Sequence, residues 1–448
     1  MDAAVTQRHT ASFLPKIAPD KNERNKSTIN SRMMEPHQAG LVSHKCDQLL
    51  SKAEISLFKN SIMQNICVEM LQEGFHRSYS ELFFLLSYDR HRRESAELGS
   101  DLSLQTPLEE QKDKLTIMRK YLSRAEQAER TNTWTVVCEQ RLFLGGYFSS
   151  KEDLWISFHF YHSCAEREHG GRSRPATEAR ACLAELYLQT GDLERAQEQA
   201  ELCIDQGEEG GWLDSDGRPL RLRGHLALWK VYSRMADSLL EAEDYEEALK
   251  MLHTGYNTAI KTEDRQVEVE AAYQLGLAYQ SAGDHDTAKQ FFNTCMQIYG
   301  TLEDGDGLGR TYKAIAKSLE SEEKLNETVQ CLETLADISR GNGLQHHLVD
   351  AYLSLGNICY KRSEYQRALE FFQQGYEISC ELRDVSRLER AQVFVATARA
   401  RCLIRKYSTD VESATPTAMK RLLAWRETRE PQDFSVDSSD DTDHTINQ

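Results

Sequence analysis

The chain has 448 residues and a formal net charge of −17, which argues against unassisted binding to nucleic-acid backbones or anionic membranes. No apolar run approaches the roughly 18 residues of a membrane span, and the first residues lack the basic and then apolar layout of a secretory signal. We therefore expect a soluble intracellular protein that binds neither nucleic acid nor membrane.

The first part of the chain is predicted to contain two segments. Residues 1–42 mix Lys, Asn, Ser and Pro with little periodicity, which is typical of a disordered arm. Residues 43–130 are predicted to be helical, and two apolar helical patterns between Cys46 and Arg90 resemble a degenerate hairpin. After a polar break, Pro107 is well placed at the first turn of a helix that reaches about Arg130.

Residues 131–407 carry an internal repeat, in which a small residue follows a bulky apolar one every 40 residues. These small residues are Ala236, Gly276, Ala316, Gly356 and Ala396. Twelve positions later stand Ala248, Ala288, Thr328 and Ala368, and four positions beyond these stand Leu252, Phe292, Leu332 and Phe372. Two earlier copies, at Gly145 and at Ala184 with Ala196, keep the internal offsets but not the register, because the run Gly207 to Pro219 is inserted before residue 236.

The apolar residues of each copy have helical spacing on both sides of a short polar turn, so each copy predicts a helical hairpin. Glycine inside a helix costs about 0.8–1 kcal/mol relative to alanine, so Gly276 needs a compensating reason. We predict that Gly276 and Ala288 lie where the paired helices approach closely, with Tyr279 and Phe292 filling the space beside them.

This pattern resembles the tetratricopeptide repeat family, whose units place small and aromatic residues at these offsets. The resemblance implies an all-α fold, a right-handed superhelical solenoid of hairpins, and the period of about 40 residues implies helices longer than those of the usual 34-residue unit. Residues Glu389 to Lys406 are expected to form an Arg-rich polar helix that caps the array. The signature positions are Gly145, Ala184, Ala196, Ala236, Ala248, Gly276, Tyr279, Ala288, Phe292, Gly356, Ala368 and Phe372.

Residues 408–448 are predicted to hold one short amphipathic helix and an acidic disordered tail. The helix, Pro416 to Thr428, carries an apolar stripe of Met419, Leu422, Leu423 and Trp425. This stripe either docks on the array as an extra cap or inserts into the groove of a partner.

The sequence predicts no catalytic residue, metal or cofactor. His159, His162, Cys164 and His169 invite a zinc hypothesis, but no second ligand pair is evident, and Cys164, Cys203 and Cys295 share a small-residue position that indicates packing. His346 and His347 are interpreted as a solvated loop pair, and the stretches Asp304 to Gly307 and Asp214 to Gly217 as turns. An enzyme or metalloprotein function hidden in residues 43–130 or in the insertion remains the alternative to a binding scaffold.

The resemblance also implies where a partner binds, because the first helices of such hairpins line a concave surface. At the corresponding positions here stand Arg310, Lys313, Lys317, Asn357 and Lys361. We hypothesise that this basic strip binds an acidic, extended segment of a partner or the acidic tail of the chain itself; the alternative is a solvated helix face. The carboxylate clamp of chaperone adaptors is absent, since Ala181, Glu185 and Arg234 occupy the corresponding positions.

The overall layout is similar to that of long-repeat tetratricopeptide proteins of motile cilia and sperm flagella. This resemblance implies a non-enzymatic adaptor in the cytoplasm and cytoskeleton, located at the axoneme of a cilium or flagellum, that supports sperm motility. Axonemal dynein and intraflagellar transport components are its candidate partners. The second interpretation is a cytosolic adaptor for cell polarity or for linking motors to cargo.

Overall fold

The structure, a computed structural model, describes residues 60–97, 99–100, 102, 105–166, 172–413 and 415–428. The predicted arm at residues 1–42 and the acidic tail after residue 428 lie outside the described residues. All described residues belong to one compact unit, which begins at Asn60.

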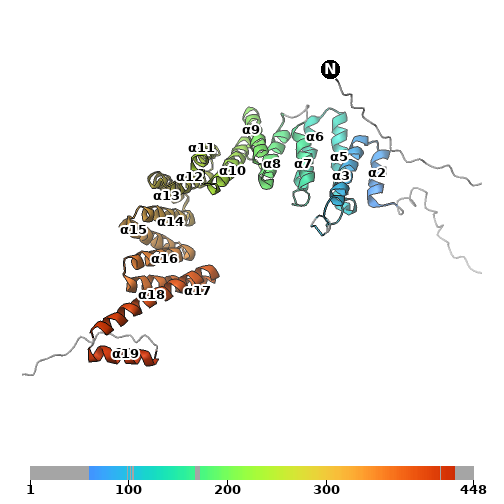
Figure 1. The fold of residues 1–448 in the computed structure, drawn as a ribbon. Helices are drawn as coiled ribbons and strands as arrows, with labels where there is room; N and C mark the ends of the chain where they lie inside the picture. Colours follow the sequence, from blue (N-terminus) through green and yellow to red (C-terminus); the bar gives the residue numbers. More distant parts are fainter. Residues whose placement is uncertain are drawn as a thin grey trace, which may run out of the picture. The chain divides into compact units, whose positions relative to one another are not determined.

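The described chain is a succession of helices (Figure 1), and within it no strand forms apart from an isolated bridge between Leu213 and Pro219. The N-terminal elements are α2 (Ile62–Gln72), α3 (His76–Glu94), the 3-10 turn η1 (Leu108–Glu110) and α5 (Lys112–Arg130). The hairpins are α6 (Trp134–Tyr147) with α7 (Leu154–Ala165), α8 (Arg174–Thr190) with α9 (Leu193–Gly210), α10 (Leu220–Glu241) with α11 (Tyr245–Ile260), α12 (Arg265–Ser281) with α13 (His285–Leu302), α14 (Gly305–Ser321) with α15 (Leu325–Gly341), and α16 (Gln345–Lys361) with α17 (Tyr365–Leu382). The last helices are α18 (Val385–Ser413) and α19 (Pro416–Thr428).

Each helix packs on the one before it and the one after it along the array, which confirms the predicted all-α tandem hairpins. Among the described helices, none is both long enough and apolar enough to cross a bilayer. The helices are amphipathic, and their apolar faces meet in small clusters shared between neighbouring hairpins, as expected for a repeat array.

The small residues of the repeat are explained by ring packing. A Cβ atom at Gly276 would lie 2.5 Å from Cε1 of Phe292, and one at Gly356 would lie 2.4 Å from Cε1 of Phe372. Both rings are buried. Gly145 has the same role, since a Cβ there would lie 2.3 Å from the ring of Tyr161. The prediction that Phe292 fills the space beside Gly276 is therefore confirmed.

Three of the turns inside the hairpins share one design. In the hairpins that begin with α8, α10 and α12, a single residue with positive φ (Gly191, Glu243 or Gly283) precedes an aspartate whose side chain caps the second helix. The side chain of Asp284 accepts a hydrogen bond of 3.1 Å from the backbone N–H of Thr287, which satisfies a donor that the helix leaves without a partner. The polar turns read from the sequence are thus the start signals of the second helices.

The stretch Asp304 to Gly307 was interpreted as a turn, which was wrong: Asp304 caps α14, and the helix begins at Gly305 and continues through Gly309. Its three glycines each make room for a neighbour. A Cβ atom at Gly305 would lie 2.9 Å from Cγ of Asn342, one at Gly307 would lie 2.3 Å from the ring of Tyr299, and one at Gly309 would lie 2.5 Å from Cδ2 of His347. The Asp214 to Gly217 stretch is a turn as predicted, closed by a 2.8 Å hydrogen bond from the backbone N–H of Arg218 to Asp214 Oδ1.

The N-terminal helices share one apolar core with the first hairpin. Leu82 of α3, Met118 of α5 and Phe160 of α7 are fully buried in the same cluster. Pro107 precedes the short turn η1 rather than the helix itself, because α5 begins at Lys112; the end at Arg130 was predicted correctly.

At the other end, α18 is longer than the predicted helix Glu389 to Lys406, and its outer side is less polar than expected. Val393 is 62% exposed and Ile404 is 57% exposed. Helix α19 has the predicted bounds and packs on α18, where the rings of Tyr407 and Trp425 lie 5.9 Å apart. This contact favours the interpretation of α19 as an added cap.

Candidate binding surface on the first helices of the repeats

The first helices of the six hairpins, α6, α8, α10, α12, α14 and α16, together with α18 after the last hairpin, form what we call the first-helix row. Each first helix contacts the next helix of the row directly, in addition to its own hairpin partner. Side chains on this row therefore meet others that are about one repeat away in the sequence.

The predicted basic residues lie on this row, but acids of the neighbouring repeats neutralise most of them. Lys313 Nζ lies 2.6 Å from Asp350 Oδ2 on α16, and Lys361 Nζ lies 2.6 Å from Glu320 Oε1 on α14. These acids are 37 and 41 residues away along the chain. The two lysines therefore connect α14 and α16 rather than forming an open row of positive charge.

Arg310 is more deeply engaged than the lysines. Its guanidinium lies between the rings of Tyr273 and Tyr299, 5.3 Å and 5.9 Å from their centroids, and it is 3.4 Å from Glu270 Oε2. Such cation–π contacts stabilise a partly buried cation by about 0.5–2 kcal/mol. Arg310 is thus a structural contact between α12 and α14 as well as a predicted binding residue.

The two remaining predicted residues are less engaged. Lys317 is exposed on α14, and Asn357 is half-buried on α16. The structure thus places all five predicted residues on two adjacent first helices, and their role in binding an acidic segment stays a prediction.

Other polar contacts join the row in the same way. Nε and Nη2 of the Arg223 guanidinium on α10 donate to the two carboxylate oxygens of Glu185 on α8, each at 2.8 Å. Burial alone would lower the pKa of Arg223, but the hydrogen bonds and charge of Glu185 raise it above its ordinary value. Gln280 of α12 donates hydrogen bonds to the Ala314 carbonyl at 2.8 Å and to Ser318 Oγ at 2.7 Å.

A hollow of about 570 Å³ opens between α8 and α10 on this row. Its lining side chains are Glu185, Leu188, Gln189, Lys230, Ser233 and Arg234. Glu185 is engaged by Arg223, and Ser233 by Gln274 at 2.9 Å. Lys230 and Arg234 are exposed and stand one helical turn apart, so the hollow presents two cations to solvent.

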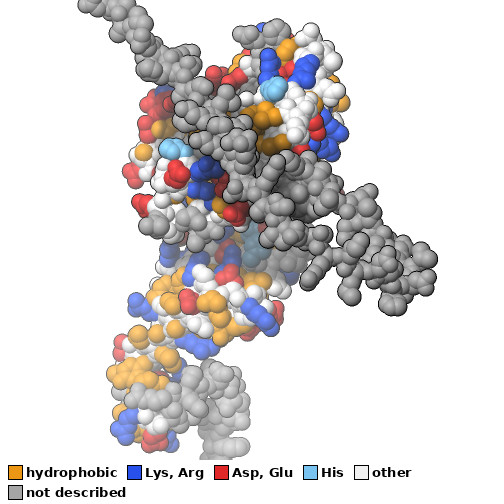
Figure 2. All heavy atoms as spheres, turned by 90° about the vertical axis from the view of Figure 1, so that its right-hand side faces the viewer, with side chains coloured by type: hydrophobic (Ala, Val, Ile, Leu, Met, Phe, Trp, Pro, Cys, Tyr) orange, Lys and Arg blue, Asp and Glu red, His pale blue; other side chains and the backbone are white. Residues whose placement is uncertain are grey.

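This hollow was missed by sequence reasoning, which considered Arg234 only as a departure from the chaperone clamp. The sequence feature that could have indicated the hollow is the pair Lys230 and Arg234. These two cations stand four residues apart on a predicted first helix, in a chain of net charge −17. Elsewhere charges of both signs are interspersed, as Figure 2 shows on the visible face.

The predicted histidine and cysteine cluster does not converge on one point. His159 Nε2 lies 2.9 Å from Glu81 Oε1, while His162 Nε2 lies 2.7 Å from the Tyr187 hydroxyl. Cys164 is fully buried, like Cys203 and Cys295, which confirms their packing role. His169 lies outside the described residues.

Glu81 instead forms a buried ion pair that connects α3 to the first hairpin. Arg141, which is 5% exposed, contacts both carboxylate oxygens of Glu81 at 2.7 Å. Burial alone would raise the pKa of Glu81, but hydrogen bonds from His159 and Arg141 lower it to about 2. The pair of Glu81 and Arg141 is therefore ionised at neutral pH, and its contacts hold α3 against α6.

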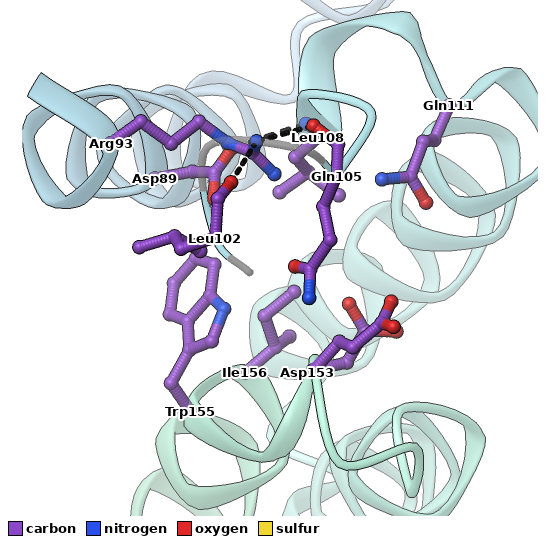
Figure 3. A pocket seen from close by; sticks show the side chains of 10 residues that line it. Asp89, Arg93, Leu102, Gln105, Leu108, Gln111, Asp153, Trp155 and Ile156 are labelled. Atoms are coloured by element: carbon purple, nitrogen blue, oxygen red, sulfur yellow. Dashed lines mark hydrogen bonds and ion pairs between the residues drawn. The ribbon is translucent and has the colours of Figure 1, made fainter. Parts of the chain in front are cut away.

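A small pocket beside α3 is lined by ten side chains, including Asp89, Arg93 and Trp155 (Figure 3). Arg93 fills its polar side: the guanidinium contacts Asp89 at 2.9 Å and donates to the carbonyls of Leu102 at 3.0 Å and Gln105 at 2.7 Å. With about 10 Å³ of free space, it holds at most a water molecule.

The comparisons with known proteins agree with the repeat architecture. A family model described as "Tetratricopeptide repeat" matches residues 230–300. A Homo sapiens protein named "Tetratricopeptide repeat protein 29" is 35% identical over 383 residues, covering 85% of this chain and 81% of the relative. A Trypanosoma brucei brucei protein of the same name is 20% identical over 342 residues, covering 76% of this chain and 68% of the relative.

Solved structures show weaker likeness. BtubC from P. vanneervenii aligns at 18% identity and a TM-score of 0.38, covering 57% of this chain and 98% of that chain. The signal transduction ATPase PH0952 from Pyrococcus horikoshii, which has a tetratricopeptide repeat sensor, aligns at 12% identity and a TM-score of 0.41, covering 66% of this chain and 47% of that chain.

Proposed function

Because the chain belongs to the tetratricopeptide repeat protein 29 family, we propose that it is a non-enzymatic scaffold whose first-helix row binds an acidic, extended segment of another protein. A protein-interaction scaffold is what the repeat family supports. The acidic ligand and the place where it binds are the finer part of the proposal.

The hollow between α8 and α10 is the observation that carries this proposal. It is open to solvent on the row where a stack of hairpins presents continuous surface, and its acid Glu185 is already paired with Arg223. Lys230 and Arg234 are exposed, and neither forms an ion pair with another residue of the described chain. The apolar side of the hollow includes Leu188. Two cations beside a partly apolar wall suit a segment that alternates Asp or Glu with a small apolar residue.

The predicted strip on α14 and α16 extends the same surface. Lys313 and Lys361 are 55% and 59% exposed although they are paired. The pair of Lys361 with Glu320 is exposed on both sides, and exposed ion pairs contribute only about 0–1 kcal/mol, so a carboxylate of a bound segment can replace Glu320 at little cost. We therefore expect the hollow to hold the segment and the strip to guide it.

A direct binding measurement tests the ligand and its place. The probe is a fluorescein-labelled peptide of residues 433–448, DFSVDSSDDTDHTINQ, measured by fluorescence anisotropy against the full chain. We expect Lys230→Glu with Arg234→Glu to weaken binding by at least about tenfold, about 1.4 kcal/mol, and higher salt to weaken wild-type binding. Unchanged affinity in the double variant would refute the role of the hollow.

The matched control reverses two cations on second helices, Arg195→Glu of α9 and Lys250→Glu of α11. It changes the net charge by the same amount and should leave the affinity within about twofold. An equal loss in the control would mean that only the total charge matters. A chain that ends at residue 428 distinguishes the sources of the ligand, because it binds the peptide more tightly than the full chain if the tail occupies the row itself.

For the cellular setting, we propose that the scaffold acts at the axoneme of motile cilia or flagella, with dynein or intraflagellar transport components as candidate partners. The support is the resemblance in layout described above together with membership of the family. Proximity labelling from the tagged chain in ciliated cells is expected to enrich axonemal proteins. Enrichment of cortical polarity proteins or cytosolic motor and cargo proteins instead would contradict this setting and favour the second interpretation.

A further inference from the structure

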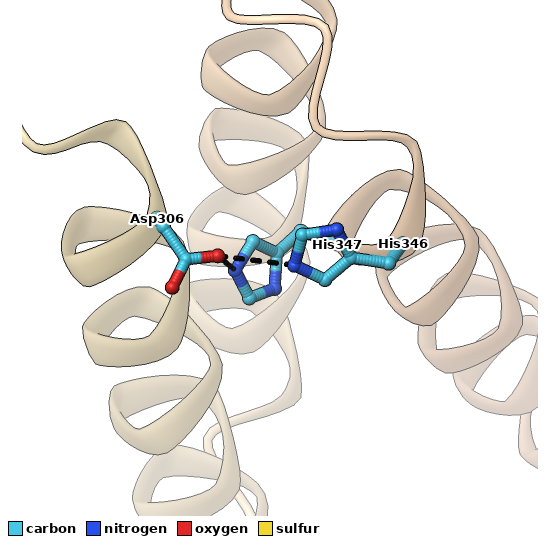
Figure 4. A group of neighbouring side chains, drawn as sticks. All are labelled: Asp306, His346 and His347. Carbon is cyan, nitrogen blue, oxygen red and sulfur yellow. Dashed lines mark hydrogen bonds and ion pairs between the residues drawn. The ribbon is translucent and has the colours of Figure 1, made fainter. Parts of the chain in front are cut away.

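Three metal-binding side chains converge between the third and fourth 40-residue units of the array, at Asp306, His346 and His347 (Figure 4). Asp306 stands in the first turn of α14, and both histidines stand in the first turn of α16. The Nε2 atoms of both imidazoles lie 3.1 Å from the same carboxylate atom, Asp306 Oδ1. The ligand atoms of the three residues all lie within 4.8 Å of one another.

The fold around His347 is built to place its ring there. The interpretation of the histidine pair as solvated was wrong for His347, which is 5% exposed. A Cβ atom at Gly309 would lie 2.5 Å from its Cδ2 and 2.8 Å from its Nε2, so only glycine lets the imidazole rest against α14.

We propose that Asp306, His346 and His347 bind a divalent transition-metal ion, Zn²⁺ in the first instance, and that this ion clamps α14 to α16. Two imidazoles and one carboxylate are a donor set that suits zinc, and three protein ligands leave a fourth position for water or for a side chain of a bound partner.

The geometry accommodates the ion with small movements. Zinc binds imidazole nitrogen and carboxylate oxygen at about 2.0–2.2 Å, so ligand atoms in a tetrahedral site stand about 3.3 Å apart. The observed separations of 3.1 Å between Nε2 and Oδ1 are close to this value. On binding, each imidazole shifts its proton from Nε2 to Nδ1, and the Nε2 lone pair that this exposes binds the metal. The Nε2–H hydrogen bonds to Asp306 are thus exchanged for metal bonds.

The nearby charges set the strength of the site. Arg310 Nε lies 3.7 Å from the second oxygen of Asp306 and opposes a cation, while the Lys313 charge is compensated by Asp350 at 2.6 Å. With three ligands and this guanidinium, the site should bind zinc more weakly than a closed four-ligand structural site.

The test uses the full chain after removal of metal with a chelator. Calorimetric titration with Zn²⁺ and absorption spectroscopy with Co²⁺ should show a site that Asp306→Asn or His346→Gln weakens by at least about tenfold, since even outer partners of metal ligands contribute about 10- to 100-fold. Gly309→Ala should weaken it too, because it displaces the His347 ring without removing a ligand. The matched control is His253→Gln, whose imidazole contacts the Tyr279 hydroxyl at 2.7 Å, and it should bind as the wild type does.

A second measurement covers variants that fold poorly. Hydrogen exchange of the wild-type chain with and without Zn²⁺ should show added protection at the first turns of α14 and α16. Equal zinc affinity in the wild type and in Asp306→Asn, or zinc-dependent protection confined to other helices, would overturn the proposal.

Discussion

Substituting Gly276 by alanine tests the physical basis of the repeat. The new Cβ atom would lie 2.5, 2.8 and 3.0 Å from three carbons of the Phe292 ring, whereas favourable carbon contacts lie at about 3.5–4.0 Å. The ring is fully buried, so it has little room to move. Overpacking of this kind costs about 1–3 kcal/mol, and alanine returns about 1 kcal/mol of helix propensity. We expect the hairpin of α12 and α13 to lose up to about 2 kcal/mol of stability.

Hydrogen exchange followed by mass spectrometry is the suitable assay, because long repeat arrays unfold locally and a single free energy of unfolding is poorly defined for them. A loss of up to about 2 kcal/mol should speed exchange in peptides of α12 and α13 by up to about 30-fold. Distant hairpins should exchange at unchanged rates because each repeat contacts only its neighbours.

The matched control is Gly300→Ala in α13. This glycine is also helical and exposed, and a Cβ atom there would have nothing within 4 Å. The substitution should therefore slow exchange through its gain in helix propensity. Adding Phe292→Leu to Gly276→Ala should give a smaller loss than the sum of the single variants. If Gly276→Ala and Gly300→Ala shift exchange in the same direction, the close approach of the helices is not what requires the glycine.

Three further predictions concern other parts of the chain. The pKa of Glu81 lies at about 2 in the folded chain, against about 4.3 in the unfolded chain. Ionised Glu81 therefore contributes about 3 kcal/mol of stability above pH 4.3, and this contribution is lost as the pH falls toward 2. In hydrogen exchange, the wild-type chain should lose protection of α3 over this pH range, and Glu81→Gln should show a smaller dependence on pH. Removing residues 414–448 should speed exchange in the second half of α18 and leave α8 to α13 unchanged, whereas an unchanged α18 would contradict the cap. At pH 8 a maleimide should label the exposed Cys380 well before the buried Cys203 and Cys295. The reason is that burial raises the pKa of the Cys203 and Cys295 thiols to about 12. Fast labelling of Cys203 and Cys295 would contradict their burial.

Local patterns in the sequence were sufficient to predict the hairpins. The small and aromatic pair in each unit, such as Gly356 with Phe372, and the bounds of α19 follow from helical periodicity, since a side chain can reach a neighbouring helix only from one face. Element ends were less certain where the start signal is tertiary. Pro107 precedes η1 and not α5. The glycines from Gly305 onward looked like turn residues, but they lie in a helix and leave the space that side chains of neighbouring helices occupy.

The candidate sites depended on contacts that no local pattern contains. Lys313 meets Asp350 and Asp306 meets His347 across 37 and 41 residues, so their pairing is set by how one hairpin stacks on the next. The hollow at Lys230 arises from the same stacking. The sequence by itself therefore determined the repeating hairpin, because that depends on contacts within one unit. Only the tertiary structure decided which charges are neutralised and which remain open, because a charge is paired or left free by the neighbouring repeat.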